Sequence, residues 1–481
     1  MNFAGDSYII VAVRLRVGCS ASVQGPSAPG GHRIEKDGVV EENVNEKFPL
    51  QDVAEPNLYR DLFPHTELPR VAFDGSGVPL SPAGEIWITD TTFRDGQQAR
   101  PPYTTEQIVD IYKLLNKLDG GAGLIRYSEF FVYSDRDREA VEGCRALALE
   151  YPEVTGWIRA VKADFKLVRG MGLRETGILT SCSDHHIFLK LKKTRKQAIE
   201  QYLDVARAAL EEGIRPRCHF EDVTRADFYG LVVPFAVELM KLRESYGIDV
   251  KIRLCDTMGF AVPWAEAALP RSVPKLVRGM IHDAGVPGEL LEWHGHNDFH
   301  KGLVNPATAW LYGCSGCNTS LLGIGERTGN TPLEGMVIEA AQLRGQDPRV
   351  NYPVITEIAE YFRTNVGYEI PHNYPLVGRD FNTTRAGIHA DGLLKSHEIY
   401  SAFDTQRILH RPVTVAITDK SGAAGIKHWI DDHYGTNVAK GDPRLLRIRD
   451  GVESEYESGR TTAISDEEMR AWYAESFGGE T

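Results

Sequence analysis

The sequence has little that would place the protein in a membrane or an oxidising compartment. The only apolar run near its start, Tyr8 to Val13, is broken by Arg14 and Arg16, so it is too short to span a membrane and weak as a secretory signal. Cysteine is scarce, with seven scattered over 481 residues, and an odd number favours a reducing compartment over a disulfide framework. We therefore expect a cytoplasmic protein with no membrane partner.

Positive charge is also in short supply. The chain has 54 Lys and Arg against 67 Asp and Glu, a formal net charge of -13, and such a field repels phosphate backbones. This excludes nucleic acid as the expected partner. Hydrophobic residues make up 42% and charged residues 25%, which is ordinary for a globular enzyme.

A Gly-rich phosphate-binding turn after the first predicted strand is missing as well, which argues against a dinucleotide-binding sheet. From Glu85 to about Gly345, short β-rich runs alternate with helical patterns such as Thr105 to Leu118 and Thr194 to Glu212, as in a parallel α/β fold. The length is close to that of a closed TIM (β/α)8 barrel, which we predict. The predicted strands include Ile86 to Thr89, Gly177 to Leu179, Val250 to Leu254 and Leu290 to His294.

Four regions follow from these patterns. Residues 1–80 lack periodicity and predict an irregular extension, and residues 81–350 form the predicted barrel. Residues 351–440 predict a smaller, mainly helical accessory region, beginning with a helix over Thr356 to Val366. Residues 441–481 are rich in Asp, Glu, Ser and Gly and predict an acidic, solvated tail with one short helix from about Ser465.

The first cluster of chemical interest, Asp90 to Gln98, follows the strand predicted at Ile86 to Thr89. In a barrel this is the carboxyl end of a strand, where catalytic groups are placed. A purely structural interpretation is also open, in which Asp90 and Thr91 cap the following helix and Arg94 pairs with Asp95 on the surface.

A second cluster, His294-Gly295-His296, ends another predicted strand. Residues i and i+2 of a strand point the same way, so both imidazoles face one side and can chelate a metal. An acidic partner elsewhere would complete a site of two histidines and one carboxylate.

Further polar clusters also fall where predicted strands end, and their joint occurrence indicates one site assembled from many strands. They are Glu221 to Arg225, Cys255 to Gly259, which includes Thr257, and the Gly-rich loop Gly323 to Asn330. Cys314-x-x-Cys317 is a weak zinc or redox motif, because no second cysteine pair or nearby histidine completes four ligands.

These clusters, in this order, resemble the DRE-TIM metallolyase superfamily, and within it the branch of 2-isopropylmalate, homocitrate, citramalate and Re-type citrate synthases. The motifs that carry the resemblance are Asp-Thr-Thr-Phe-Arg-Asp-Gly at Asp90 to Gly96, His-Gly-His-Asn-Asp at His294 to Asp298 and Gly-Ile-Gly-Glu-Arg-Thr-Gly-Asn at Gly323 to Asn330. The resemblance covers about Glu85 to Tyr434. It implies a divalent metal, Mn2+, Mg2+ or Co2+, held by Asp95, His294, His296 and Asn330, with Arg94 as a catalytic arginine.

The stretch Ala386 to Gly392 resembles the accessory segment of these synthases, in which a histidine reaches the active site of the neighbouring subunit. The resemblance therefore implies a homodimer with His389 as catalytic base, assisted by Tyr400 or Glu221. Two departures stand out. Gln97 replaces the Glu usual in isopropylmalate synthases, and the sequence after Tyr434 is too short for their leucine-binding regulatory domain.

The ligand set predicts condensation of acetyl-CoA, as co-substrate, with a 2-oxo acid whose carbonyl is polarised by the metal. A dicarboxylic acceptor needs a cation, for which Arg126, Arg159 and Arg217 are available. Wider stretches most resemble Re-citrate synthases, which makes oxaloacetate the expected acceptor. 2-Isopropylmalate or homocitrate synthesis, an acyl-CoA lyase, a non-haem iron oxygenase and a non-catalytic binding protein remain alternatives. The substrate-binding candidates are Arg126, Glu129, Arg159, His186 and Thr257.

Overall fold

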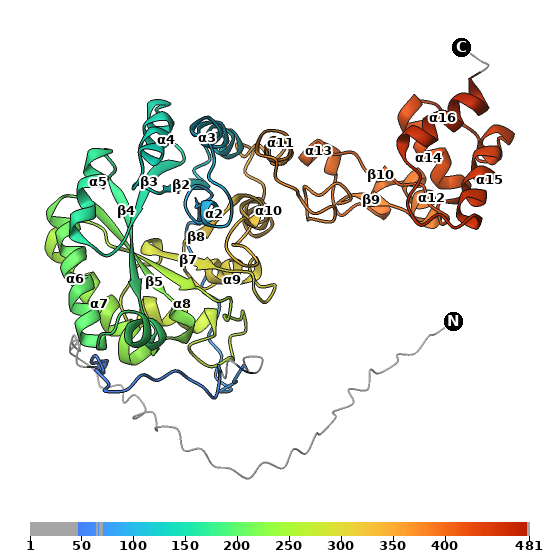
Figure 1. Ribbon diagram of the computed structural model, residues 1–481. Coiled ribbons are helices and arrows are strands. Elements are labelled where there is room, and N and C mark those ends of the chain that lie inside the picture. The colour runs from blue at the N-terminus through green and yellow to red at the C-terminus, as the bar shows by residue number, and fades with distance from the viewer. Residues whose placement is uncertain (1–46, 64–65, 67–70, 479–481) are drawn as a thin grey trace, which may run out of the picture. The chain divides into compact units, whose positions relative to one another are not determined.

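A computed structural model describes residues 47–63, 66 and 71–478, and Figure 1 shows it as a ribbon. Eight parallel strands close into a barrel in the order of the sequence, and β8 pairs with β1. The predicted TIM barrel is thereby confirmed. The strands are β1 (Trp87–Asp90), β2 (Ile125–Phe130), β3 (Glu153–Ile158), β4 (Glu175–Ser181), β5 (Arg215–Glu221), β6 (Lys251–Asp256), β7 (Leu291–Gly295) and β8 (Gly316–Thr319).

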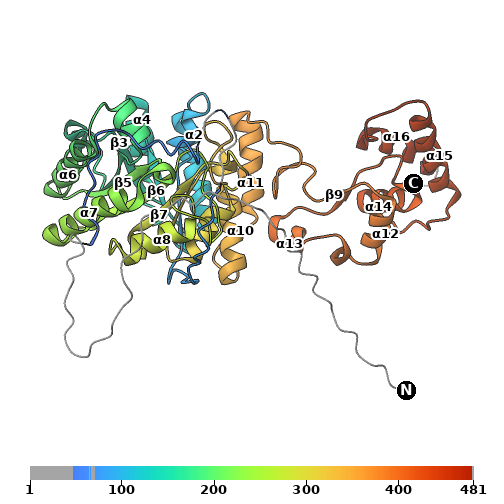
Figure 2. The same ribbon diagram turned by 90° about the horizontal axis from the view of Figure 1, so that it is seen from below.

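Helices connect the strands and cover the outside of the barrel, as Figures 1 and 2 show from two directions. They are α2 (Asp95–Gln98), α3 (Thr105–Asp119), α4 (Asp135–Ala146), α5 (Phe165–Gly170), α6 (Arg195–Glu211), α7 (Val233–Tyr246), α8 (Val273–His282), α9 (Val304–Leu311) and α10 (Leu333–Arg344).

Helix α3 illustrates how the local sequence defines these elements. The Thr104 hydroxyl accepts a hydrogen bond from Gln107 N, and the Gln107 side-chain oxygen accepts one from Thr104 N, so both bonds of a capping box are present. Ile111 and Leu115, spaced four apart, face the strands and are buried. The helix ends at Gly120, whose φ of 60° is the left-handed conformation that glycine adopts without strain.

The elements expected in the barrel agree with these bounds. The runs predicted at Ile86 to Thr89 and Thr105 to Leu118 correspond to β1 and α3. His185 and His186 lie beyond β4, which ends at Ser181, and they begin a wide helical turn, His185–Lys190.

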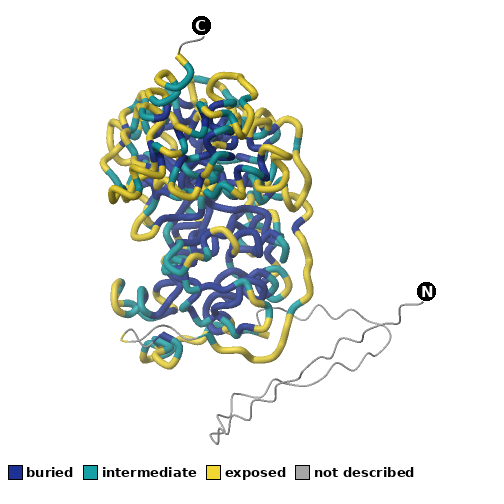
Figure 3. Tube along the Cα trace, turned by 90° about the vertical axis from the view of Figure 1, so that its right-hand side faces the viewer, coloured by how far each residue is buried: buried dark blue, intermediate teal, exposed yellow. Residues whose placement is uncertain are grey.

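The apolar core lies between the strands and the surrounding helices, and Figure 3 shows the buried residues in dark blue. The inside of the barrel is different. Bulky branched side chains usually fill it, whereas here it contains charged side chains with at most 8% of their surface exposed. These are Glu129, Glu175, Arg217, Lys251, Arg253 and Glu292.

The region after residue 350 is mainly helical, as predicted. It contains α11 (Val354–Tyr361), α12 (Gly387–Lys395), α13 (Thr405–Leu409), α14 (Gly422–Tyr434), α15 (Pro443–Glu457) and α16 (Asp466–Phe477), with a small parallel pair, β9 (Thr383–Thr384) and β10 (Thr414–Val415).

The last part of the chain differs from the expected solvated tail. Residues 443–477 form two helices, α15 and α16, rather than one. Leu445, Ile448 and Met469 are buried in a core that these helices share with Trp429 of α14. The amphipathic spacing of these apolar residues outweighs the acidic composition of the segment.

Residues 1–46 of the predicted N-terminal extension lie outside the described residues. The part that is described runs irregularly and contacts the barrel, where Asn57 N donates to Asp184 Oδ2 at 2.9 Å and Lys275 Nζ pairs with Asp74 at 2.6 Å. Among the described residues, no helix is both long and apolar enough to cross a membrane.

Candidate active site

The predicted site residues mostly follow the carboxyl ends of the barrel strands. Arg94 and Asp95 lie after β1, Glu221 ends β5, and Thr257 follows β6. His294 belongs to β7, His296 comes directly after it, and Asn330 lies in the loop that follows β8. A parallel barrel gathers these strand ends at one face, which is where TIM-barrel enzymes build their sites.

The histidine pair has a defined geometry. The Nε2 atoms of His294 and His296 are 3.3 Å apart. His294 Nδ1 donates to Asn318 Oδ1 at 2.7 Å, which leaves its Nε2 with a free lone pair. Burial holds the pKa of His294 well below its usual range and lowers that of His296 to about 4, so both rings are neutral. Neutral imidazoles are the form that binds metals.

Asp95 and Asn330 complete the group. The Asp95 carboxylate pairs with Arg94 and accepts a hydrogen bond from Asn330 Nδ2 at 3.3 Å, and its Oδ2 lies 3.7 Å from His294 Nδ1. The other amide atom, Asn330 Oδ1, is buried and has no hydrogen-bond partner among the described residues. A β-carbon on Gly325 would lie 2.2 Å from that oxygen, so only glycine fits there.

This set of donors fits a divalent cation. Two nitrogens at about 2.1 Å from one ion, at roughly tetrahedral or octahedral angles, are about 3.0–3.4 Å apart, which matches the histidine pair. The unpartnered Asn330 Oδ1 is a further oxygen donor. In the described part of the chain, no three His, Cys, Asp or Glu side chains are already grouped as a metal site. The group around His294 is not such a cluster, because the Asp95 carboxylate faces Arg94 and the fourth donor, Asn330, is an amide.

Arg94 is a buried cation in this group. Its guanidinium lies 4.2 Å from the centre of the Trp157 ring and 5.8 Å from that of Phe131. Burial lowers the pKa of Arg94 to about 10, although Glu129 opposes the shift, so the side chain stays charged at neutral pH. The surface pairing considered for Arg94 and Asp95 is wrong, because only 12% and 6% of the two side chains are exposed.

A second group lies around Glu221. His186 Nδ1 is 3.0 Å from Glu221 Oε2, Lys190 Nζ is 3.5 Å from Oε1, and the Ser181 hydroxyl donates to the same carboxylate. Burial raises the pKa of Glu221, but His186 and Ser181 outweigh it and bring the pKa to about 2. The negative charge of Glu221 also acts on Arg94, which indicates that the two groups share the barrel end.

Thr257 lies beside this group. Its Oγ1 accepts from Asp222 N at 2.8 Å, and its carbonyl accepts from Arg327 Nη2 at 2.6 Å.

Two predicted substrate-binding residues, Arg126 and Arg159, lie elsewhere than expected, whereas Glu129 lies inside the barrel. Arg126 is near the start of β2, pairs with Glu85 at 2.5 Å and stacks on Trp87, at the opposite end of the barrel from the histidines. Glu129 is fully buried inside the barrel, where it pairs with Arg217 and Arg253, and its charge also acts on Arg94. Arg159 follows β3, but its side chain is 62% exposed and pairs with Asp164 at 3.1 Å.

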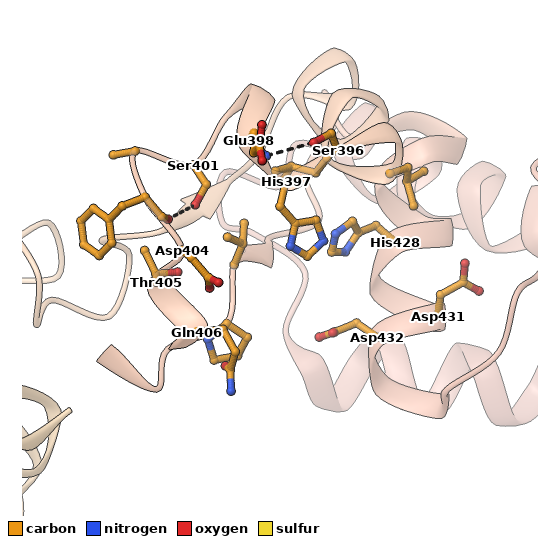
Figure 4. Close-up of a pocket in the computed structure, with 16 residues that line it drawn as sticks. Ser396, His397, Glu398, Ser401, Asp404, Thr405, Gln406, His428, Asp431 and Asp432 are labelled. Atoms are coloured by element: carbon orange, nitrogen blue, oxygen red, sulfur yellow. Dashed lines mark hydrogen bonds between the residues drawn. The ribbon is translucent and has the colours of Figure 1, made fainter. Parts of the chain in front are cut away.

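His389 and Tyr400 belong to the helical region. Their rings are 4.2 Å apart, and both residues are exposed. A cavity of about 950 Å³ lies in the same region (Figure 4), where His397 and His428 face each other and Asp432 lies nearby. No predicted site residue lines this cavity.

Two residues of the site, Asn318 and Trp157, were not predicted from the sequence. Asn318 lies in β8 directly beside His294 in the strand register, and Trp157 lies in β3 under Arg94. The signal for Asn318 was its polarity within an otherwise buried strand, Gly316–Thr319.

The profile of the HMGL-like family matches residues 85–361, more than half of the chain. The chain belongs to the HMGL-like family. Enzymes of the HMGL-like family generally depend on a divalent metal, which agrees with the donors around His294.

The chain is similar to several curated members of the HMGL-like family. It is 59% identical to the citrate (Re)-synthase of Syntrophus aciditrophicus, covering 88% of this chain and 68% of that one. It is 52% identical to the citrate (Re)-synthase of Clostridium kluyveri, covering 88% and 94%. The 2-phosphinomethylmalate synthase of Streptomyces hygroscopicus is 36% identical, with 89% and 98% covered.

Proposed function

We propose that the protein is a citrate (Re)-synthase. In this reaction the methyl carbon of acetyl-CoA forms a bond to the keto carbon of oxaloacetate, and water cleaves the thioester, giving citrate and free CoA. The observation that carries the proposal is the 59% and 52% identity to two citrate (Re)-synthases over 88% of the chain. The matched part of the chain therefore includes residues beyond the barrel.

The metal would be held by Asp95, His294, His296 and Asn330. The buried oxygen of Asn330 and the facing histidine nitrogens support this assignment. When bound, a divalent ion such as Mn2+, Mg2+ or Co2+ polarises the keto group of the acceptor and makes its carbon electrophilic.

Arg94 has the place and charge to stabilise the oxygen that becomes negative as the new bond forms. Its guanidinium is fixed by the ring of Trp157 and by Asp95, so it needs no rearrangement during the reaction. Burial excludes water and strengthens its electrostatic effect.

The base that removes the acetyl proton is, we propose, His389 of a neighbouring copy of the chain, assisted by Tyr400 or Glu221. Large apolar side chains around this pair are exposed, with Ile388 at 74%, Ile399 at 51% and Tyr400 at 46%. Such a patch is unusual on a monomer and favours a subunit contact. The protein would then act as a homodimer, with each site completed by its partner.

We also propose a cytoplasmic location. The cysteines in the described part of the chain, six in number, are all free and buried, which suits a reducing compartment.

A substrate panel tests the proposed function. Purified protein with Mn2+ or Mg2+ and acetyl-CoA is given oxaloacetate, 2-oxoglutarate, 2-oxoisovalerate or pyruvate, and the released CoA thiol is measured. Release with oxaloacetate and formation of citrate are expected. Release only with 2-oxoisovalerate or 2-oxoglutarate would make the protein an isopropylmalate or homocitrate synthase, and no release would overturn the synthase assignment.

A further inference from the structure

A dicarboxylic acceptor needs a cation for the carboxylate far from its keto group, and the arginines considered above do not supply it. Arg126 is paired with Glu85 at the other end of the barrel. Arg159 is largely exposed and engaged by Asp164. Arg217 donates to Glu175 at 2.6 Å and to Thr155 at 3.2 Å, and it also pairs with Glu129. Its Nε makes no hydrogen bond to the described residues, but it faces the Glu292 carboxylate at 3.8 Å.

Arg253, in β6, has one edge of its guanidinium free. Nη1 donates to Glu129 Oε1 at 3.0 Å, and Nε donates to Glu292 Oε2 at 2.5 Å. Nη2 is buried and finds no hydrogen-bond partner in the part of the chain that the structure describes, and only 1% of the side chain is exposed. Two carboxylates thus hold the cation in one orientation, and an uncompensated donor remains, which is costly unless a ligand accepts from it.

The register of the strands places Arg253 directly beneath the histidine pair. Arg253 is aligned with Glu292 of β7, and Cys255 is aligned with His294. Arg253 is therefore two residues below the metal-binding level on the inward face, about 6–7 Å along the strand.

Arg217 occupies a different level of the same charged interior. It lines a small cavity of about 10 Å³ together with Trp87, Lys251 and Glu289, near the amino ends of the strands. Arg253 does not line that cavity. Arg217 is therefore two residues closer to the amino ends of the strands than the level of Arg253, although both arginines pair with Glu129.

From this geometry, we propose that the free Nη2 edge of Arg253 binds the distal carboxylate of the 2-oxo acid and so selects a four-carbon dicarboxylate. The inference rests on the proposed function. In oxaloacetate a single methylene separates the keto carbon from the distal carboxylate. This short spacer suits the separation of two residues along the strand between the level of His294 and that of Arg253. 2-Oxoglutarate is one methylene longer, and a monocarboxylate would leave the buried donor unpaired.

Binding measurements on Arg253→Lys test this without relying on turnover. Lysine keeps the charge but cannot donate to two carboxylates and a ligand from fixed positions. Mn2+-loaded protein is titrated by calorimetry with oxaloacetate and, separately, with pyruvate. We expect oxaloacetate binding to weaken about 10–100-fold in Arg253→Lys and pyruvate binding to change little. The matched control is Arg217→Lys, which alters the same charged interior nearer the amino ends of the strands. It should change the binding of neither oxaloacetate nor pyruvate.

The opposite pattern would overturn the inference: pyruvate binding weakened as much as oxaloacetate binding, or Arg217→Lys acting as strongly as Arg253→Lys. If Arg253→Lys does not fold, judged by circular dichroism, the double variant Arg253→Gln with Glu292→Gln removes one charge of each sign and has the same expected outcome. Failure of the proposed function would show separately, as absence of CoA release by the unaltered protein even though oxaloacetate binds.

Discussion

The Nε2 atoms of His294 and His296 face each other across 3.3 Å, at the carboxyl end of the seventh barrel strand. Asn318 holds the opposite ring nitrogen of His294 from the next strand. The pair is therefore oriented before any ion binds, and this preorganisation is the basis of the proposed metal site.

Asn318→Ala should weaken metal binding about 10–100-fold, because His294 loses the hydrogen bond that fixes its ring and its tautomer. Mn2+ binding can be followed by electron paramagnetic resonance. Asn305→Ala is a matched control, since Asn305 is equally buried and its amide bonds Ala261 O at 3.1 Å instead of a histidine. Equal effects of the two variants would argue against the orienting role of Asn318.

Arg94→Lys should lower kcat about 10²–10³-fold and change the thermal unfolding temperature little, because a lysine cannot reproduce the planar cation over Trp157. Arg100→Lys provides the control, since Arg100 also stacks on an aromatic ring, that of Tyr103 at 4.0 Å. If kcat of Arg94→Lys stays within a few fold of the unaltered protein, Arg94 is not a catalytic residue.

Much of this site was predictable because barrel strands end in their functional residues. The polar clusters at Asp90 to Gln98 and at His294 to His296 follow strands, so sequence order alone brought Arg94, Asp95 and both histidines to one face. Arg126 was misplaced for a physical reason. A strand of six residues spans the whole barrel, and a cation near its start, like Arg126 in β2, faces the other end.

The helices of the last forty residues were mispredicted because of their acidic composition. Leu445, Ile448 and Val452 have helical spacing, but the intervening charged residues lowered the mean hydropathy and suggested a solvated tail. Hydrogen bonds between strands, such as that of His294 with Asn318, depend on the register of the barrel, which no local pattern reveals.

Stability should depend on the ionisation of Glu221. Its pKa is lowered from 4.5 to about 2 in the folded protein, with His186 and Ser181 outweighing burial, so the ionised carboxylate stabilises the fold above pH 4.5. That contribution is lost as the pH falls from about 5 toward 2. The free energy of unfolding, from urea titrations at several pH values, should therefore fall more steeply for the unaltered protein than for Glu221→Gln. Parallel curves would contradict this.

Activity should be shared between subunits if His389 acts on its partner. Arg94→Ala and His389→Ala are each expected to be nearly inactive, whereas a refolded or co-expressed mixture should recover about one quarter of full activity, because half of the dimers are mixed and each has one intact site. A mixture as inactive as the separate variants would place His389 in its own subunit's site or outside catalysis.

Removal and return of the metal tests the account most directly. Chelator-treated protein should release no CoA thiol from acetyl-CoA and oxaloacetate, and Mn2+ should restore release and citrate formation in the unaltered protein but not in His294→Ala. Full activity after chelation, or restoration by Mn2+ in His294→Ala, would contradict a metal-dependent synthase built on Asp95, His294 and His296.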